Sequence, residues 1–424
     1  MKDETIAIHS GYQTDPTTKA VAVPIYQTVA YEFDNAQHGA DLFNLAVPGN
    51  IYTRIMNPTN DVLEQRVAAL EGGVAALALS SGQAAIHYSI INIAEAGNNI
   101  VSVPMLYGGT YTLFAHMLPK LGIDVRFAKD DRAASMEPLI DDKTAAVYCE
   151  TLGNPAGNIP DLEAIARMAH RHGIPVIVDN TVPTPVLMKP IEYGADIVVH
   201  SLTKYMGGHG TSIGGIIVDS GKFPWVEHAQ RFPMLNNPEP AYHGVIYTEA
   251  LGPAAYIGRV RTVALRNTGS AMSPMNAFFF LQGIETLSLR MERHTENALN
   301  VAHYLEKHPR VAWVKYAGLP SSEYYPLAQK YMKGRPSALL AFGIKGGFDA
   351  GVKFYDALKL FKRLVNIGDA KSLAAHPAST THRQLTGPEL AAAGVTADMI
   401  RLCIGIEHID DILEDLQQAL AAAS

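Results

Sequence analysis

The chain has 424 residues, which exceeds the size at which one hydrophobic core usually stops growing, so we expect at least two domains. Apolar residues make up 48% and charged residues 18% of the sequence, and this composition excludes global disorder. The formal net charge of −7, without a run of Lys and Arg, disfavours nucleic acid as a partner. No apolar stretch approaches the ~20 residues that span a bilayer, so a membrane is not expected either.

Residues 1–60 lack a long periodic element and are rich in Pro, Gly, Asn and Tyr. Their aromatic and β-branched content indicates an N-terminal arm that packs on another surface. The first residues show no apolar leader, so we expect a cytoplasmic protein with reduced thiols. Cys149 and Cys403 each lie in an apolar run, which indicates two buried thiols and neither a disulfide nor a metal site.

Residues 61–265 are expected to form the larger domain, in which strand and helix signals alternate. A helical pattern starts at Pro160-Asp161 and meets a glycine stop at Gly173. Alternation of this kind predicts an α/β fold with a mostly parallel sheet and helices on both faces. The expected strands are Ala75–Leu79, Ile100–Val103, Ile123–Phe127, Ala145–Cys149, Pro175–Val178, Asp196–His200 and Ile213–Val218.

Residues 266–424 are expected to form a smaller C-terminal α/β domain. A long helical pattern runs from Asn276 to about Lys307, and helices are expected at about 349–360 and 409–422. The strand-like runs of this part are Val311–Val314, Ala338–Ile344, Arg363–Ile367 and Met399–Ile404.

Polar side chains follow several strands of the predicted parallel sheet, where ligands of such sheets bind. They are Ser81-Gly82, Asn154, Asp179, and the group Ser201, Thr203 and Lys204. Each has an ordinary structural explanation: Ser81 could simply cap a helix, Asp179 could be half of an ion pair, and Lys204 could be a surface lysine. Their common place at neighbouring strand ends favours one ligand.

Pyridoxal phosphate has a chemical group for each of these side chains. Its phosphate suits a helix N-terminus with hydroxyls, its ring nitrogen suits an aspartate, its aldehyde suits a lysine amine and its ring suits an aromatic face. The candidates are Gly82, Gln83, Ser201 and Thr203 for the phosphate, Asp179 for the nitrogen, Lys204 for the aldehyde and Tyr107 for the ring.

Other motif interpretations are weaker. Ser201 and Lys204 also match S-x-x-K of serine–lysine acyl enzymes, but neither of the partner tripeptides S-D-N and K-T-G occurs. Gly208-His209-Gly210 fails the spacing of a dinucleotide-binding fingerprint, and the histidines show no metal-ligand pattern. A non-catalytic binding protein would not need a lysine, an aspartate and a phosphate turn together.

The motifs resemble those of the fold-type I pyridoxal-phosphate enzymes of cysteine and methionine metabolism, over nearly the whole chain. Several of them in the right order are far more specific than any one. They are YTRIMNPT (52–59), LSSGQAA (79–85), LYGGTY (106–111), ETLGNP (150–155), VDNT (178–181), HSLTKYMGGHG (200–210), HPAST (376–380) and RLCIGIE (401–407).

The resemblance implies a role for each matching position. Lys204 would be the lysine that binds the cofactor. Lys204 and Tyr107 would be the catalytic residues. Tyr52 and Arg54 resemble the pair that reaches the cofactor phosphate of a neighbouring subunit, which implies a dimer and commonly a homotetramer. Asn154, Ser372 and Arg401 resemble the groups around the substrate carboxylate, where arginine suits bidentate binding.

Three features resemble the sulfhydrylase branch of the family, which replaces the acetate of O-acetylhomoserine by sulfide or methanethiol in methionine biosynthesis. They are the segment 242–274, the motif NIGDAKSL (366–373), and Gly109, where methionine γ-lyases typically place a cysteine. The expected enzyme is therefore a transferase that forms homocysteine or methionine. Methionine γ-lyase, O-succinylhomoserine sulfhydrylase and cystathionine γ-synthase are the alternatives within the family.

Overall fold

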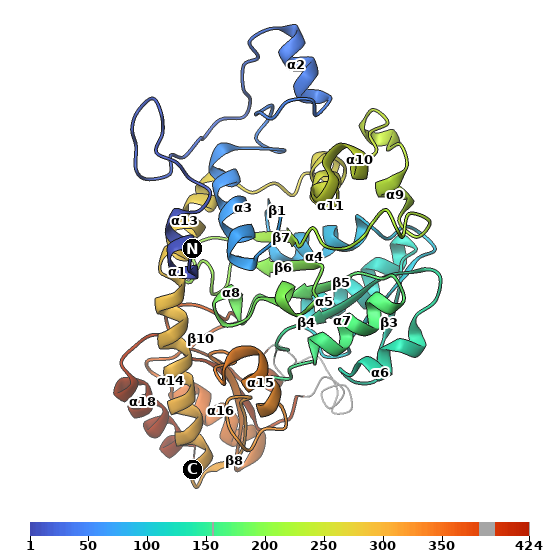
Figure 1. Ribbon diagram of the computed structural model, residues 1–424. Coiled ribbons are helices and arrows are strands. Elements are labelled where there is room, and N and C mark those ends of the chain that lie inside the picture. The colour runs from blue at the N-terminus through green and yellow to red at the C-terminus, as the bar shows by residue number, and fades with distance from the viewer. Residues whose placement is uncertain (155–156, 381–394, 424) are drawn as a thin grey trace.

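The computed structural model describes residues 1–154, 157–380 and 395–423, and Figure 1 shows two sheets in different parts of the molecule. The larger sheet has seven strands in the order β1-β7-β6-β5-β4-β2-β3. Its strands are β1 (Ala75–Leu79), β2 (Asn99–Ser102), β3 (Asp124–Phe127), β4 (Thr144–Glu150), β5 (Val176–Asp179), β6 (Ile197–Ser201) and β7 (Gly215–Asp219).

Strand β7 runs antiparallel to both of its neighbours, and the other neighbouring pairs are parallel. The sheet is thus mostly parallel, as the alternating pattern predicted. Helices pack against it, and its central strands β4 and β6 are almost wholly buried. Burial on both faces explains why these strands are continuous apolar runs instead of alternating ones. The predicted stop at Gly173 is confirmed, because α7 (Leu162–Arg171) ends beside this glycine at φ +64°.

The smaller sheet has five strands in the order β10-β11-β12-β9-β8 and is mostly antiparallel. Its strands are β8 (Val311–Lys315), β9 (Leu339–Ile344), β10 (Lys362–Arg363), β11 (Leu373–Ala375) and β12 (Met399–Cys403). In Figure 1 it lies at the end of the molecule opposite the N-terminal arm, and the long helix α14 (Leu287–Lys307) connects it to the larger part.

Two predictions for this part were wrong. The strand expected over Arg363–Ile367 ends at Arg363, and the apolar side chains of Leu364 and Val365 remain 41% and 64% exposed. The helix expected from Asn276 to Lys307 is broken at Thr286, whose backbone leaves the helical region at φ −108° and ψ 11°. The apolar periodicity continues across this break, so it could not predict where the first helix ends.

The N-terminal arm carries the short helices α1 (Asp3–His9) and α2 (Ala36–Phe43) before α3 (Pro58–Glu71). Helix α1 packs against α3, whereas α2 and the loops around it stand clear of the body in Figure 1. Several apolar side chains of the arm are exposed, among them Val29 at 62% and Tyr52 at 39%. This exposure suits a surface that another chain covers.

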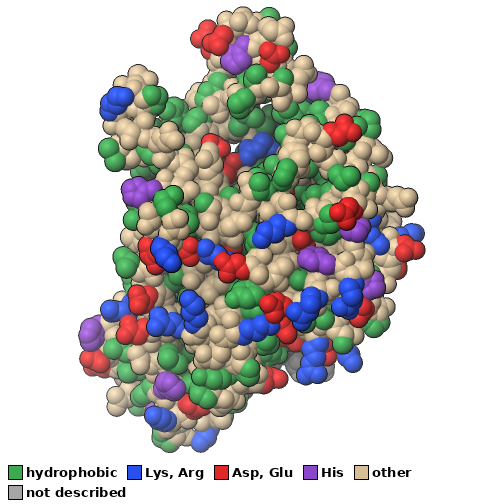
Figure 2. Space-filling model, in the orientation of Figure 1, with side chains coloured by type: hydrophobic (Ala, Val, Ile, Leu, Met, Phe, Trp, Pro, Cys, Tyr) green, Lys and Arg blue, Asp and Glu red, His purple; other side chains and the backbone are tan. Residues whose placement is uncertain are grey.

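The remaining helices are α4 (Gly82–Ile91), α5 (Gly108–Thr112), α6 (Ala133–Met136), α8 (Thr184–Leu187), α9 (Pro233–Asn236), α10 (Tyr247–Leu251), α11 (Ala255–Arg259), α12 (Arg266–Thr268), α13 (Pro274–Glu285), α15 (Tyr325–Met332), α16 (Gly347–Ala357) and α18 (Ile409–Ala422). None of the described helices is long and apolar enough to cross a bilayer. On the face in Figure 2, basic and acidic side chains are interspersed and form no region of one sign.

Candidate active site

A cavity of about 270 Å³ opens at the carboxyl ends of the parallel strands. The turns after β1 and β2 and the ends of β4, β5 and β6 all supply side chains to it, and the smaller sheet region closes it with residues 365–367 and Arg401. The predicted residues that line it are Gly82, Gln83, Tyr107, Asn154, Asp179, Ser201, Thr203, Lys204 and Arg401.

One end of the cavity is formed by the N-terminus of α4. Ser81 caps this helix by accepting the backbone N–H of Ala84 at 3.1 Å. The first N–H groups of a helix have no partner inside the helix, so those of Gly82 and Gln83 remain available for an anion. A Cβ atom at Gly82 would lie 2.6 Å from the Cβ of Ser201, so only glycine lets these two segments approach so closely. Thr203 lines the same cavity, with its hydroxyl bonded to the backbone of Gly214.

Asp179 is the last residue of β5, and its carboxylate lines the cavity. Burial raises the pKa of this carboxyl above its ordinary value, and hydrogen bonds from Thr181 act in the opposite direction. One of these bonds is the Thr181 N–H to Asp179 Oδ1, at 2.9 Å. A largely buried carboxylate that faces a cavity calls for a cationic partner there.

Lys204 lies three residues beyond β6, and its Nζ donates to Oδ1 of Asn366 at 2.6 Å. Burial is the main cause that lowers the pKa of Lys204, and the nearby positive charge of Arg401 lowers it further. A lowered pKa increases the fraction of neutral amine, which is the nucleophilic and proton-accepting form. This contact with Asn366 also argues against a serine–lysine acyl enzyme, because the amine is bonded to an amide and not to Ser201.

Arg401 is the third residue of β12 and enters the cavity from the smaller sheet. Its guanidinium donates to Oδ1 of Asn154 at 3.3 Å and to the backbone carbonyl of Asn366 at 3.2 Å. These described partners are amides and not carboxylates, and burial lowers the pKa of the group. The arrangement leaves a largely buried positive charge available to a carboxylate in the cavity.

Tyr107 follows β2 at the N-terminus of α5, lines the cavity and remains 46% exposed. Its backbone N–H donates to Oε1 of Glu150 at 2.7 Å. A Cβ atom at Gly109 would lie 2.7 Å from Cε1 of the Tyr107 ring, so the glycine permits the observed position of the ring. The tyrosine is thus placed by its neighbours in sequence and by the end of β4.

Three residues expected at the site lie outside the cavity. Ser372 is fully buried, and its hydroxyl donates to Glu407 Oε2 at 2.9 Å and accepts the Gly405 N–H at 2.9 Å. The structure thus places the Ser372 hydroxyl between Glu407 and Gly405, and Ser372 is not among the residues that line the cavity. Tyr52 and Arg54 are exposed on the arm, with the guanidinium 5.2 Å from the centre of the Tyr52 ring.

Some lining residues had no assigned role in the sequence. They are Glu150, Thr181, Ile213, Val365 and Asn366, among others. Glu150 and Thr181 lie inside the motifs ETLGNP and VDNT, and Asn366 begins NIGDAKSL. The motifs therefore located the segments that form the site but did not show which of their residues line the cavity. The contact between Lys204 and Asn366 spans 162 positions and only the folded chain reveals it.

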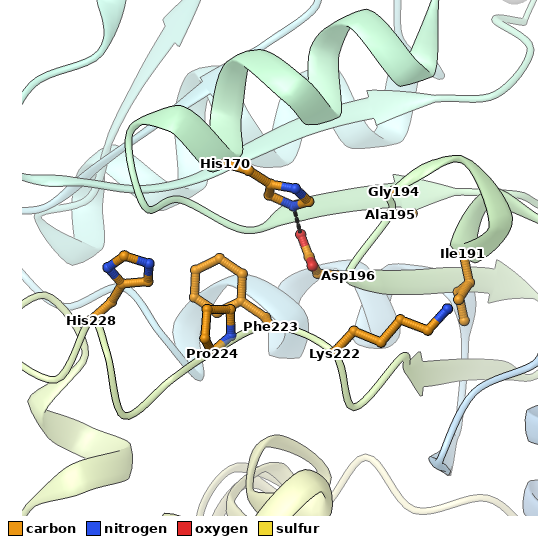
Figure 3. Close-up of a pocket in the computed structure, with 9 residues that line it drawn as sticks. All are labelled: His170, Ile191, Gly194, Ala195, Asp196, Lys222, Phe223, Pro224 and His228. Atoms are coloured by element: carbon orange, nitrogen blue, oxygen red, sulfur yellow. Dashed lines mark hydrogen bonds and ion pairs between the residues drawn. The ribbon is translucent and has the colours of Figure 1, made fainter.

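A second hollow lies at the opposite ends of the same strands (Figure 3). His170, near the end of α7, points toward Asp196 just before β6, and His170 Nε2 lies 2.8 Å from Asp196 Oδ2. Lys222 and Phe223 follow β7, and His228 lies on the far side of Phe223. Of the polar side chains here, His170 and Asp196 are partners of each other.

The cavity at the carboxyl ends has the donor set that pyridoxal phosphate requires. A helix N-terminus with hydroxyls suits the phosphate, the Asp179 carboxylate suits the protonated ring nitrogen, and the Lys204 amine suits the aldehyde. The mostly parallel sheet with this set at its carboxyl edge defines the class as the fold-type I pyridoxal-phosphate enzymes.

Comparison with known proteins agrees with this class. The chain belongs to the Cys/Met metabolism PLP-dependent enzyme family, whose model matches residues 4–421, and pyridoxal phosphate is its cofactor. It is 53% identical to the O-acetyl-L-homoserine sulfhydrylase of Leptospira meyeri, covering 99% of this chain and 96% of that one. It is 51% identical to O-acetyl-L-homoserine sulfhydrylase 1 of Thermus thermophilus, over 99% of this chain and 100% of that one.

A solved structure is similar over the same length. The putative O-acetylhomoserine (thiol)-lyase of Campylobacter jejuni superimposes with a TM-score of 0.96 at 42% identity, covering 99% of this chain and 100% of that one. That crystal structure contains N'-pyridoxyl-lysine-5'-monophosphate, a lysine joined to the cofactor.

Proposed function

We propose that the protein replaces the acetate of O-acetyl-L-homoserine by sulfide or methanethiol, giving homocysteine or methionine. The observation that carries this proposal is the cavity in which one lysine, one aspartate and one arginine converge, in a chain about half identical to named O-acetylhomoserine sulfhydrylases. The bond between Cγ and the acetate oxygen breaks, the acetate leaves with the electron pair, and the sulfur nucleophile forms the new bond to Cγ and loses a proton.

Arg401 and Asn154 are the proposed carboxylate site. The guanidinium is held by amide groups at 3.2 and 3.3 Å, so its planar fork is oriented before the substrate arrives. A substrate α-carboxylate bound there would bring its amino group and Cα toward Lys204, which lines the same cavity. Binding at this point thus orients the atoms that exchange protons.

Lys204 is the proposed proton carrier. Bound pyridoxal phosphate supplies an aldehyde for the amino group and a ring that withdraws electrons from Cα. Burial favours the neutral Lys204 amine, which would accept the proton from Cα, deliver it to the bound cofactor and, neutral again, accept one from Cβ as acetate departs. Asp179 holds the ring nitrogen protonated, and Tyr107 supplies the aromatic face. The phosphate is proposed to bind to Gly82, Gln83, Ser201 and Thr203.

The cavity favours the acetyl donor over the succinyl donor. A succinyl group carries a second carboxylate, and the cations among the described lining residues are Lys204 and Arg401, both already assigned. The mouth is formed in part by apolar Ile213 and Val365, which are 63% and 64% exposed. Gly109 is a departure from the methionine γ-lyases, which typically place a cysteine there, and in this chain a Cβ at that position would lie 2.7 Å from the Tyr107 ring.

A substrate panel on the purified yellow protein tests this function. O-acetylhomoserine, O-succinylhomoserine, cystathionine and methionine are each incubated with and without sulfide, and homocysteine, acetate and keto acid are measured. We expect homocysteine from the acetyl ester with sulfide as the main product. Keto acid from methionine as the main product would instead indicate a γ-lyase, and a preparation that pyridoxal phosphate cannot colour would contradict the whole assignment.

We also propose a cytoplasmic homo-oligomer, a tetramer built from two dimers, in which residues 1–60 complete the neighbouring subunit's site. The residues 61–265 would form the cofactor-binding domain and the residues 266–424 the C-terminal domain. Tyr52 and Arg54 support this arrangement, because they are exposed and lie outside the cavity of their own chain. The exposed apolar side chains of the arm point to the same conclusion.

Subunit mixing tests the shared site. Lys204→Ala and Arg54→Ala are each expected to be poorly active alone. If Arg54 serves the neighbour, subunits unfolded and refolded together form mixed dimers in which one site has both residues intact. Activity should then reappear on mixing, whereas additive residual activity would show that each site is built from one chain.

A further inference from the structure

Glu150 is a buried carboxyl of the cavity that has no part in the reaction proposed above. It is the last residue of β4, is 6% exposed and lines the cavity. Its Oε1 accepts the backbone N–H of Tyr107 at 2.7 Å, and the backbone N–H of Asn154 is a second donor to the same carboxyl. One side chain therefore joins the two segments that carry the proposed stacking ring and the proposed carboxylate contact.

Glu150 also lies beside Asp179. The two residues are directly paired in the register of the parallel strands β4 and β5. Paired residues of neighbouring strands point to the same face of a sheet, so the two carboxyls share the edge of one cavity. Two carboxyls that share a buried site do not both ionise readily, because their charges repel where little water screens them.

The surroundings decide which carboxyl keeps the proton. Asp179 accepts hydrogen bonds from Thr181, and the positive potential of His200 also lowers its pKa. Burial, and after it the charge of Asp179, raise the pKa of Glu150 well above its ordinary value. The backbone N–H groups of Tyr107 and Asn154 act in the opposite direction and lower the pKa of Glu150, but a neutral carbonyl oxygen can also accept their hydrogen bonds.

We propose that Glu150 is a positioning residue which, as a neutral carboxylic acid, fixes the Tyr107 and Asn154 segments and leaves Asp179 as the charged carboxylate of the cavity. The effect extends to the substrate side, because Oδ1 of Asn154 accepts a hydrogen bond from Arg401. A second negative charge at this position would repel a substrate carboxylate approaching Arg401. The inference concerns the cofactor pocket and is independent of which acyl donor the enzyme uses.

Rescue by the conservative variant tests the proposal. Glu150→Gln keeps the length and the acceptor oxygen but cannot ionise, whereas Glu150→Ala removes the acceptor. Loss of a buried hydrogen bond of about 1–2 kcal/mol corresponds to roughly tenfold in an equilibrium constant. We expect Glu150→Ala to raise the dissociation constant for pyridoxal phosphate, measured by reconstituting apoenzyme, by about tenfold or more. Glu150→Gln should stay within about threefold of the wild type.

Two further measurements follow the residue directly. Hydrogen exchange of the backbone N–H of Tyr107 should become faster in Glu150→Ala and stay slow in Glu150→Gln, because only the latter keeps the acceptor. In infrared difference spectra, the C=O stretching band of a protonated carboxylic acid should disappear in Glu150→Gln. Neither reading depends on turnover, so failure of the proposed reaction would leave this test intact.

The outcomes separate clearly. If Glu150→Gln binds cofactor as poorly as Glu150→Ala, the negative charge is needed and the proposal is wrong. If Glu150→Ala binds like the wild type, Glu150 positions nothing. Should Glu150→Ala fail to fold, Glu150→Asp takes its place, since its shorter side chain draws the acceptor away, and wild-type affinity and exchange there would overturn the proposal.

Asp219→Asn is the matched control for these variants. It removes another buried carboxyl of the same sheet, at the end of β7 and outside the cavity. It should leave cofactor affinity within about twofold of the wild type. A loss as large as that of Glu150→Ala would show a general effect of removing buried carboxyls and would count against positioning by Glu150.

Discussion

The two ends of the large, mostly parallel sheet differ in the partners of their buried charged side chains. At the carboxyl ends, Lys204 and Arg401 are bonded to amide groups, and neither forms an ion pair with a described carboxylate. At the amino ends, Oδ2 of Asp196 lies 2.8 Å from Nε2 of His170 and accepts a hydrogen bond from the backbone N–H of Val176 at 2.8 Å. The carboxyl edge thus has two largely buried cations without a charged partner, whereas the buried Asp196 of the amino edge has His170 as its partner.

This difference indicates which edge is built for a ligand. A buried charge without a partner costs several kcal/mol, so it persists where a bound molecule supplies the partner. A charge that is paired with a partly exposed side chain, as Asp196 is with His170, needs no ligand, and the pair contributes modestly to stability. Substitutions at the carboxyl edge should therefore change catalysis and cofactor binding, and those at the amino edge should change stability.

Lys204→Ala should give the largest effect at the carboxyl edge. Removing the amine that carries protons at two carbons should lower kcat by about 10³-fold or more, and the bound cofactor should lose its covalent link and its yellow colour. Steady-state kinetics and the absorption spectrum measure both. Lys222→Ala, at the amino edge, is the matched control and should keep its activity within about twofold. Comparable losses in the two variants would contradict the distinction between the edges.

Asp219→Asn should give the largest effect at the amino edge, on stability and not on turnover. Burial raises the pKa of Asp219 from 3.8 to about 7, and Oδ2 has no hydrogen-bond partner in the described structure. As the pH rises from about 4 to about 7, the unfolded chain releases this proton before the folded chain does. The unfolded state then binds fewer protons, so stability falls, by on the order of 4 kcal/mol.

The asparagine variant cannot ionise, so it should not show this loss. Its thermal unfolding midpoint should exceed that of the wild type at about pH 8, and the difference should shrink at about pH 5. The Gly221 N–H that donates to Oδ1 at 2.8 Å keeps an acceptor in the variant. A difference between the two proteins that does not change with pH would contradict the raised pKa of Asp219.

Gly109→Ala should give a smaller effect at the carboxyl edge. The new Cβ would lie 2.7 Å from the Tyr107 ring, so the ring must move, at a cost of about 1–3 kcal/mol. Cofactor affinity and kcat/KM should fall by about tenfold. Gly108→Ala is a close control, since a Cβ there meets no atom within 4 Å. Equal effects of the two substitutions would show that cofactor affinity and kcat/KM depend on the freedom of the glycine backbone and not on contact with the Tyr107 ring.

The sequence predicted the parts of the site that local chemistry determines. Strand β1 was placed correctly at Ala75–Leu79, and the cap by Ser81 follows from strand-to-helix turn chemistry. Lys204 and Asp179 could be paired with one cofactor because parallel strands bring their carboxyl ends to one edge. These inferences need only the order of the strands and not their packing.

What the sequence could not predict depends on tertiary contacts. Ser372 was expected near the substrate, yet Glu407 and Gly405 occupy its hydroxyl. The apolar run after Arg363 reads as a strand, but the chain leaves the sheet and brings Val365 and Asn366 to the cavity. Such a departure follows from contacts between segments far apart in the chain, which periodicity does not report.

His170→Gln should give the smallest effect and tests the amino edge most sharply. The hydrogen bond to Asp196 raises the pKa of His170, although burial acts in the opposite direction. The folded pKa therefore lies above 6.5, so the stabilising contribution is fully present below pH 6.5 and is lost as the pH rises through the folded pKa. Because the side chain is 41% exposed, water screens the pair, and the contribution should be about 0.5 kcal/mol.

Glutamine can still donate a hydrogen bond to Asp196 but carries no charge. The unfolding midpoint of His170→Gln should lie about 1–2 °C below that of the wild type at pH 6 and approach it at pH 8, with kcat/KM unchanged. Catalysis should be insensitive, because the pair lies in the hollow of Figure 3, whose lining residues all differ from those of the Lys204 cavity. A change in kcat/KM larger than the change in stability would show that the two edges are coupled through the strands.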